Sequence, residues 1–150
     1  MIVLAIVGVL AAYAVPSMRD MIQATKLRTA ASDFYGAMIL ARSEAIKRRA
    51  NVTITPAAAG WTGGWTVATG ATTLAAHDAL DTAILVQVNV PAVSASAIVY
   101  GMNGRVSSAS QNVIFYITPS VAQPRCMSID PSGMPRSRTD TNLTATDGCN

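Results

Sequence analysis

The sequence is poor in the residues that metal binding and catalysis most often use. It contains one histidine, His77, and two cysteines, Cys126 and Cys149, among its 150 residues. No two of these three residues stand at the spacing of metal ligands, which argues against a metal site. The G-x-S-x-G, P-loop and H-E-x-x-H motifs are missing as well. We therefore expect no cofactor and no enzymatic activity.

Charged residues are also scarce, and they are unevenly distributed. They make up 13% of the chain, about half the usual fraction of a soluble domain. The first eighteen residues contain none of them. The net charge of +3 is only mildly basic and is weak evidence for a nucleic-acid partner. A chain of 150 residues suits one domain with one core. The uncharged N-terminal segment is therefore interpreted separately from that domain.

The uncharged beginning predicts a helix in an apolar environment. Residues 1–15 read MIVLAIVGVLAAYAV, and a helix of eighteen residues spans roughly 27 Å, slightly less than the ~30 Å core of a bilayer. A signal peptide would require a basic segment before the apolar run. A buried core helix would need more interior than a domain of this size provides. We expect a membrane-anchoring half-helix, residues 1–18, which begins before Met1.

Residues 19–50 are predicted to continue this helix with one apolar face. Between Ser17 and Ala50 there is no proline and a single glycine, Gly36. Apolar residues recur at alternating spacings of four and three, which places them on one stripe of a helix. These residues are Leu27, Ala31, Phe34, Met38, Ala41 and Ala45. The two halves together predict a helix of about 50 residues, roughly 75 Å long.

Residues 51–150 are predicted to form a β-rich head. Asn103-Gly104 indicates a hairpin turn, and Asp130-Pro131-Ser132-Gly133 suits a type I turn. Residues Thr69–Thr82 are mostly small or polar and are predicted to form a loop, with His77 exposed in it. The tryptophans Trp61 and Trp65 are expected in a hairpin and in the core. One long helix followed by six or seven strands predicts an α+β fold, in which the helix covers an antiparallel sheet.

The first eighteen residues also carry a family resemblance. MIVLAIVGVLAAYAVPSM resembles the N-terminal segment of type IV pilins and type II secretion pseudopilins from Met1 to Pro16, apart from Tyr13, where an aliphatic residue is commoner. The resemblance implies that about six residues precede Met1, among them an N-methylated first residue and a glutamate. It also implies that the helix is kinked at Pro16, where a proline removes a hydrogen bond.

The head narrows the resemblance to the GspH/FimT group of minor pilins and pseudopilins. The segments that carry it are GWTGGWTV after the helix, Gly104-Arg105-Val106 in the first hairpin and, more loosely, residues 132–136 in the second. The resemblance implies a FimT/FimU-like minor pilin that primes a type IV pilus at or near its tip. Its alternative is a GspH-like pseudopilin of type II secretion. Other pilin subunits would be its partners, and it would lie in the bacterial inner membrane, with the head in the periplasm, before assembly.

The two cysteines admit two interpretations. An even and minimal number in a chain with a membrane lead-in favours a Cys126–Cys149 disulfide, and two buried thiols are the alternative. Such a bond would staple the polar tail to the sheet. C-terminal disulfide loops are common in pilins, so the resemblance implies the disulfide as well.

Four arginines are candidates for DNA binding. Arg136-Ser137-Arg138 resembles the R-x-R part of a motif with which some FimT-like pilins bind DNA, although Met134 and Pro135 separate it from the preceding glycine. Alternate residues of a strand share a face, so the side chains of Arg136 and Arg138 would reach the same phosphate backbone of DNA. Arg105 and Arg125 would join them if the hairpins are neighbours. The alternative is that these arginines are solvated or contact other subunits.

Overall fold

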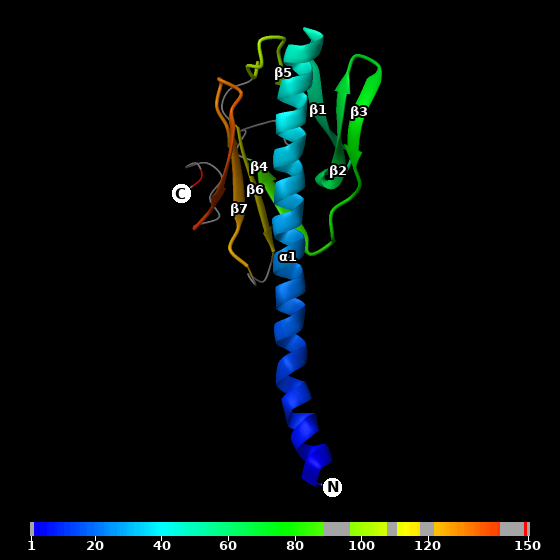
Figure 1. The fold of residues 1–150 in the computed structure, drawn as a ribbon, viewed down its shortest axis with the longest axis vertical. Coiled ribbons are helices and arrows are strands. Elements are labelled where there is room, and N and C mark those ends of the chain that lie inside the picture. Colours follow the sequence, from blue (N-terminus) through cyan, green and yellow to red (C-terminus); the bar gives the residue numbers. More distant parts are fainter. Residues whose placement is uncertain (1, 89–96, 108–110, 118–121, 142–148, 150) are drawn as a thin grey trace.

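A computed structural model describes residues 2–88, 97–107, 111–117, 122–141 and 149. Side chains are described from Met18 onward within these ranges, apart from Gln111 and Ile117. A long helix, α1 (Ile2–Arg48), precedes the strands of the head (Figure 1). The strands are β1 (Val52–Ala57), β2 (Gly60–Thr69), β3 (Thr72–His77), β4 (Ile84–Val88), β5 (Ile98–Tyr100), β6 (Gln111–Ile117), β7 (Arg125–Ile129) and β8 (Pro135–Thr139). The predicted α+β fold is confirmed.

The strands form two antiparallel sheets that flank α1. The first has the order β3-β2-β1-β5 and the second the order β4-β6-β7-β8. Figure 1 shows the upper half of α1 running over both sheets, while its lower half extends beyond the head toward the N-terminus. The β3–β4 connection therefore leads from one sheet to the other.

The helix α1 is continuous through Pro16 and ends in a well-defined cap. The Arg49 amide donates to Ile46 O at 3.4 Å and the Ala50 amide to Ala45 O at 3.3 Å. This is the Schellman arrangement, in which the residue after the helix adopts a left-handed conformation. Arg49 occupies that position with φ 51°. In the described part of the chain, no helix combines the length and apolarity that crossing a membrane requires.

The core lies between the apolar stripe of α1 and both sheets. Leu27, Ala31, Met38, Ala41 and Ala45 are buried as the spacing predicts. Phe34 is the central side chain. Its ring lies 5.1 Å from each tryptophan ring, Trp61 and Trp65, and 5.4 Å from Phe115. The prediction that both tryptophans belong to the core is confirmed.

The loop predicted for Thr69–Thr82 is wrong over half its length. Thr72–His77 forms strand β3, which pairs with β2 from Thr69↔Thr72 to Trp65↔His77. Its residues are small or polar because β3 is an edge strand whose side chains are mostly exposed or half-buried. Backbone pairing, which does not depend on side-chain hydrophobicity, holds the strand in place.

The hairpin predicted at Asn103-Gly104 is also shorter than expected. Among the described residues beyond the turn, Val106 forms one bridge to Tyr100, and the Ser107 amide donates to Val99 O at 3.0 Å. The turn is drawn toward α1 instead, because Arg42 Nε donates to Gly104 O at 3.2 Å. Gly133 lies against the backbone carbonyl of Gly104, so the two predicted turns are next to each other.

Candidate interaction surfaces

The face of α1 that points away from the sheets is free of charge. Its side chains follow spacings of four and three from Met18 to Ser43, and all of them are exposed. We call this set the outward seam: Met18, Ile22, Thr25, Thr29, Ser32, Gly36, Ile39 and Ser43. The exposed fraction is 66% at Met18 and 49% at Ile22, which is unusual for apolar side chains of that size. The helix thus has one apolar stripe buried in its own head and an opposite uncharged stripe whose residues are exposed, with Thr25, Thr29 and Ser32 among those that line two open cavities.

Charged side chains flank the outward seam on both sides. At 100° per residue, Arg28 and Arg42 lie on one side, and Lys26, Asp33, Glu44 and Arg48 lie on the other. Glu44 bonds Arg48 and lies 3.4 Å from Lys47. The Arg48 hydrogen bond lowers the pKa of Glu44 against a smaller opposing effect of burial. Glu44 is therefore paired at one margin, and the seam is uncharged from Met18 to Ser43, after which its spacing leads to Lys47.

Gly36 lies in the middle of the outward seam without an intramolecular reason for being glycine. A Cβ added at Gly36 would meet nothing within 4 Å, and the residue lies inside a regular helix. Glycine in a helix interior destabilises by about 1 kcal/mol relative to alanine. The bare position lets another backbone approach α1 closely.

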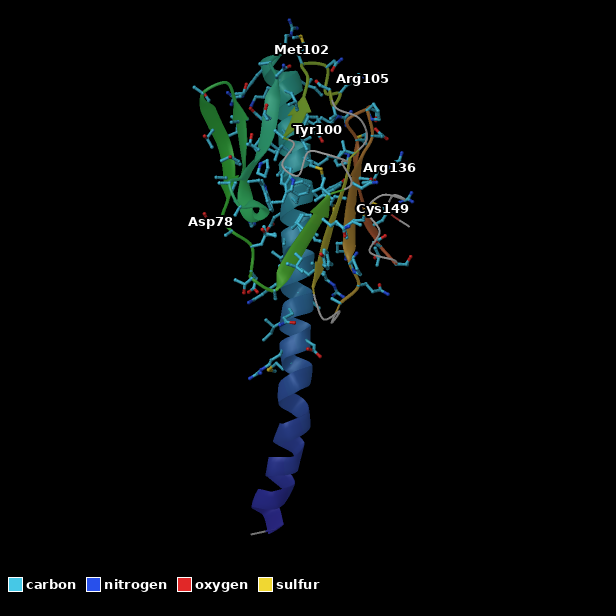
Figure 2. All side chains as sticks on the ribbon, turned by 180° about the vertical axis from the view of Figure 1, so that it is seen from behind. Asp78, Tyr100, Met102, Arg105, Arg136 and Cys149 are labelled. Carbon is cyan, nitrogen blue, oxygen red and sulfur yellow. A yellow bond between two sulfur atoms is a disulfide. The ribbon has the colours of Figure 1, made fainter. Side chains whose placement is uncertain are left out.

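The structure separates the four candidate arginines into three places. Arg136 and Arg138 pair with Ser128 and Cys126, so they lie on the outer face of the second sheet, away from α1. Arg125 pairs with Thr139 and lies on the inner face, in a small cavity of about 230 Å³ that Arg28 also lines. Arg105 follows the turn near the end of α1, above Arg136 in Figure 2. The two arginines of the R-x-R motif share a face, and Arg125 does not join them.

Neither arginine of the R-x-R motif is buried, but one has a nearby acid. Arg136 Nη2 lies 3.9 Å from Asp130 Oδ2. The carboxylate of Asp130 also accepts from the Ser132 hydroxyl, and that bond is the main reason why the pKa of Asp130 is lowered. Two exposed arginines on one edge strand can contact a phosphate backbone, yet they provide only a weak and salt-sensitive attraction.

The cysteines are joined on this same outer face. Cys126 and Cys149 form a disulfide with their Cα atoms 5.6 Å apart. Cys126 and Ile114 are buried there, with Tyr116 and Cys149 packed against them, in a small cluster separate from the main core. The bond fixes the C-terminal end of the chain to β7. The bond was expected to staple the polar tail Thr139–Asp147, of which residues 142–147 lie outside the described residues.

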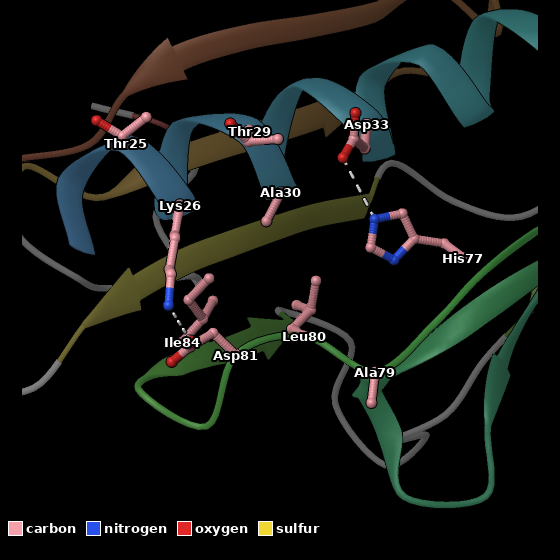
Figure 3. A pocket seen from close by; sticks show the side chains of 10 residues that line it. All are labelled: Thr25, Lys26, Thr29, Ala30, Asp33, His77, Ala79, Leu80, Asp81 and Ile84. Atoms are coloured by element: carbon pink, nitrogen blue, oxygen red, sulfur yellow. Dashed lines mark hydrogen bonds and ion pairs between the residues drawn. The ribbon is translucent and has the colours of Figure 1, made fainter. Parts of the chain in front are cut away.

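A polar cavity lies between α1 and the β3–β4 connection. It has a volume of about 380 Å³, and two side-chain contacts cross it, one of them an ion pair (Figure 3). Lys26 Nζ lies 2.6 Å from Asp81 Oδ2, and His77 Nε2 lies 3.3 Å from Asp33 Oδ2. The hydrogen bond from Lys26 is the main cause that lowers the pKa of Asp81. His77 is thus a contact residue rather than the solvated loop residue that the sequence predicted.

Comparison with known proteins assigns the family. A family model described as Type II transport protein GspH matches residues 30–133 of the chain. The chain belongs to the GspH family. Among curated proteins, none matches it.

Solved structures agree with this assignment at the level of the fold. The type IV minor pilin FimU of Pseudomonas aeruginosa superposes on the GspH-family chain with a TM-score of 0.65 at 18% identity, covering 87% of this chain and 99% of FimU. The minor pseudopilin EpsH of the Type 2 Secretion System of Vibrio cholerae gives a TM-score of 0.58 at 11% identity, covering 76% of this chain and 97% of EpsH. The fold is the pilin fold, and the GspH/FimT resemblance is confirmed.

The remaining site predictions for this GspH-family chain concern Pro16 and metal binding. Pro16 lies within α1, and a kink there stays a prediction. Within the described ranges, no three His, Cys, Asp or Glu side chains gather as metal ligands would. The outward seam was not predicted, although its spacing is as regular as that of the apolar stripe. Its threonines, serines and glycine are not apolar, so a search for hydrophobic periodicity misses the seam. In the sequence it can be found as a run of uncharged positions at helical spacing.

Proposed function

We propose that this GspH-family chain is a minor pilin subunit of a type IV pilus, with a structural and assembly-priming role at or near the filament tip. The observation that carries the proposal is the outward seam. A helix that is uncharged on two opposite faces is expected to pack against other protein on both of them. The head of this chain provides one side, and other subunits provide the second.

The geometry of the outward seam fits a helix as the partner. Alternating spacings of four and three repeat every 3.5 residues, the period at which helices pack along one another at about 20°. Small residues such as Thr29, Ser32 and Gly36 permit close approach, and the flanking charges are positioned to contact a partner at the margins. The seam also continues toward residues 1–18, which carry no charge. A bundle of such helices forms the filament core.

The proposed organisation has three parts. Residues 1–18 are the half-helix that lies in the inner membrane before assembly and in the filament core afterwards. Residues 19–50 connect this half to the head and carry most of the outward seam, and residues 51–150 form the head. The uncharged sequence of the first part supports the membrane stage, since a charged side chain there would be costly.

The experiment is complementation of a deletion strain, read as surface pili per cell with the major pilin level measured in parallel. Loss of pili at normal pilin level, restored by the wild-type chain, supports the proposal. Thr29→Lys places a charge in the outward seam and is expected to abolish restoration. Thr29→Ala, which keeps the seam small and uncharged, is the matched control and is expected to restore pili. Normal piliation in the deletion strain would instead favour a type II secretion pseudopilin, tested by measuring secreted proteins.

A second candidate function is DNA binding for transformation. The observation that favours it is the shared exposed face of Arg136 and Arg138. Replacing both with alanine is expected to abolish DNA retention by the folded chain, whereas Arg125→Ala on the opposite face leaves it intact. Retention that persists in the double variant would exclude these arginines as a DNA site.

A further inference from the structure

The connection between β3 and β4 is fastened to α1 at both of its ends. We call residues Asp78–Ala83 the strap. At the first end, His77 faces Asp33 of α1 at 3.3 Å, and at the second, Asp81 of the strap faces Lys26 at 2.6 Å (Figure 3). Lys26 and Asp33 are seven residues apart, so they lie on one side of the helix two turns apart. The strap is therefore held over the cavity by the Lys26–Asp81 ion pair and by the His77–Asp33 contact next to its first residue.

The imidazole ring of His77 lies between two acceptors. Its Nδ1 is 2.7 Å from the carbonyl oxygen of Asp78, and its Nε2 is 3.3 Å from Oδ2 of Asp33. A neutral imidazole has one N–H, so it donates to one of these oxygens and turns a lone pair toward the other. Only the doubly protonated ring donates to both. The site therefore places an acceptor oxygen at each ring nitrogen.

The ring is held in place by its neighbours rather than by these two contacts alone. It stacks on Trp65 with centroids 4.2 Å apart and an interplanar angle of 15°. A cation stacked on an indole gains further stabilisation. Gly64, with φ 93°, leaves the room that the His77–Asp78 backbone occupies, because a Cβ there would clash with the His77 and Asp78 carbonyl groups. Trp65 and Gly64 thus position the imidazole between its acceptors.

The charged side chains around the cavity come from α1 and from the strap. Asp33 and Lys26 face the cavity from α1, and Asp78 and Asp81 belong to the strap. Strands β2 and β4 contain no charged residue, and β3 contains none besides His77. Lys26 is paired with Asp81, and Asp33 is the carboxylate that faces the ring. The surroundings are net negative when His77 is neutral.

We propose that His77, Asp33 and the strap form a pH-sensitive clasp, which is closed when His77 is protonated and loosened when it is neutral. Imidazole side chains as a class change charge between about pH 5 and pH 8. Protonation gives His77 a second partner, so the clasp is present at low pH and is lost as the pH rises. The Lys26–Asp81 ion pair holds the other end of the strap.

The test is amide hydrogen exchange of the strap, measured on the full chain in detergent micelles at pH 5.5 and pH 8.0 and corrected for the intrinsic rate at each pH. An exposed ion pair contributes a few tenths to 1 kcal/mol, so the strap is expected to open about threefold more at pH 8.0. Asp33→Ala is expected to remove this difference. Asp20→Ala, an exposed aspartate on the same helix, is the matched control and is expected to keep it.

Two further variants separate the clasp from a general loosening. His77→Gln is expected to give equal opening at both pH values, since glutamine does not titrate. Lys26→Met is expected to increase opening at both pH values while leaving the difference between them. The proposal is overturned if the wild-type strap opens equally at both pH values, or if Asp33→Ala retains the full pH difference.

Discussion

At the scale of single residues, Tyr100 is buried with an unsatisfied hydroxyl. Its side chain is fully buried, and in the described part of the chain its hydroxyl has no hydrogen-bond partner. Burial raises the pKa of Tyr100 to about 12, against a smaller opposing effect of Arg42. An acid with a raised pKa in the folded state stabilises the fold below its unfolded pKa of 10 and loses that contribution as the pH rises through about 12.

Tyr100→Phe is therefore expected to stabilise the chain. Removing an unsatisfied buried hydroxyl is expected to raise the free energy of unfolding by about 1 kcal/mol at pH 7. The decline of stability between pH 10 and pH 12 should also become shallower. Denaturant unfolding at pH 7 and pH 11 measures both effects. Lower stability of the variant at pH 7 would show that the hydroxyl is satisfied.

Two glycines offer a matched pair of substitutions with opposite expected signs. Gly133 has φ 78°, and a Cβ there would overlap the carbonyl of Gly104. Gly133→Ala is expected to lower stability by at least about 2 kcal/mol, because left-handed strain alone amounts to roughly 1–2 kcal/mol. Gly36→Ala is expected to raise stability by about 1 kcal/mol. Urea unfolding of both variants tests the pair, and equal effects would contradict the contact between the two turns.

At the scale of elements, the disulfide joins the chain end to β7 apart from the main core. The two cysteines are 23 residues apart in sequence, and closing a loop of that length stabilises by about 3 kcal/mol in the chain-entropy model. Cys126→Ser with Cys149→Ser is expected to lower the free energy of unfolding by about that amount. Circular dichroism should show that the helix and sheets persist, because Cys126 packs with Ile114 and not with Phe34. Collapse of the whole fold would contradict this separation.

The elements that the sequence predicts well are those with a strong period of their own. The stripe from Leu27 to Ala45 is buried as expected because helical spacing alone decides which side chains share a face. Strand β3 could not be predicted, because its segment TTLAAH is held by backbone pairing at an edge. The residues of this segment do not indicate which strand pairs with it.

Contacts between residues far apart in the sequence could not be predicted for a related reason. Arg125 lies on the opposite face from Arg136 because Arg125 pairs with Thr139, and a shift of one residue in that register would reverse the outcome. Asp33 and His77 are 44 residues apart, and they meet because the strap crosses from one sheet to the other. Register and crossover are properties of the assembled head, so single-strand patterns do not contain them.

At the scale of the whole molecule, the two halves of α1 differ in what covers them. From Leu27 to Ala45 the helix packs on the sheets, whereas Arg19 and Met21 are exposed. Helices without tertiary packing are marginal in water. The segment 19–24 of a dispersed chain has neither the head nor a partner beside it, so its helical hydrogen bonds are expected to open readily.

Assembly should change this segment more than any part of the head. Amide exchange of residues 19–24 is expected to be at least tenfold faster than that of residues 30–41 in the dispersed chain in micelles. In assembled filaments the two segments are expected to exchange at similar slow rates, since a partner helix on the outward seam covers the exposed turns. The Thr29→Lys chain provides the control, because it should keep fast exchange under assembly conditions. If residues 19–24 exchange at the same rate before and after assembly, the seam has no partner at that level of the helix.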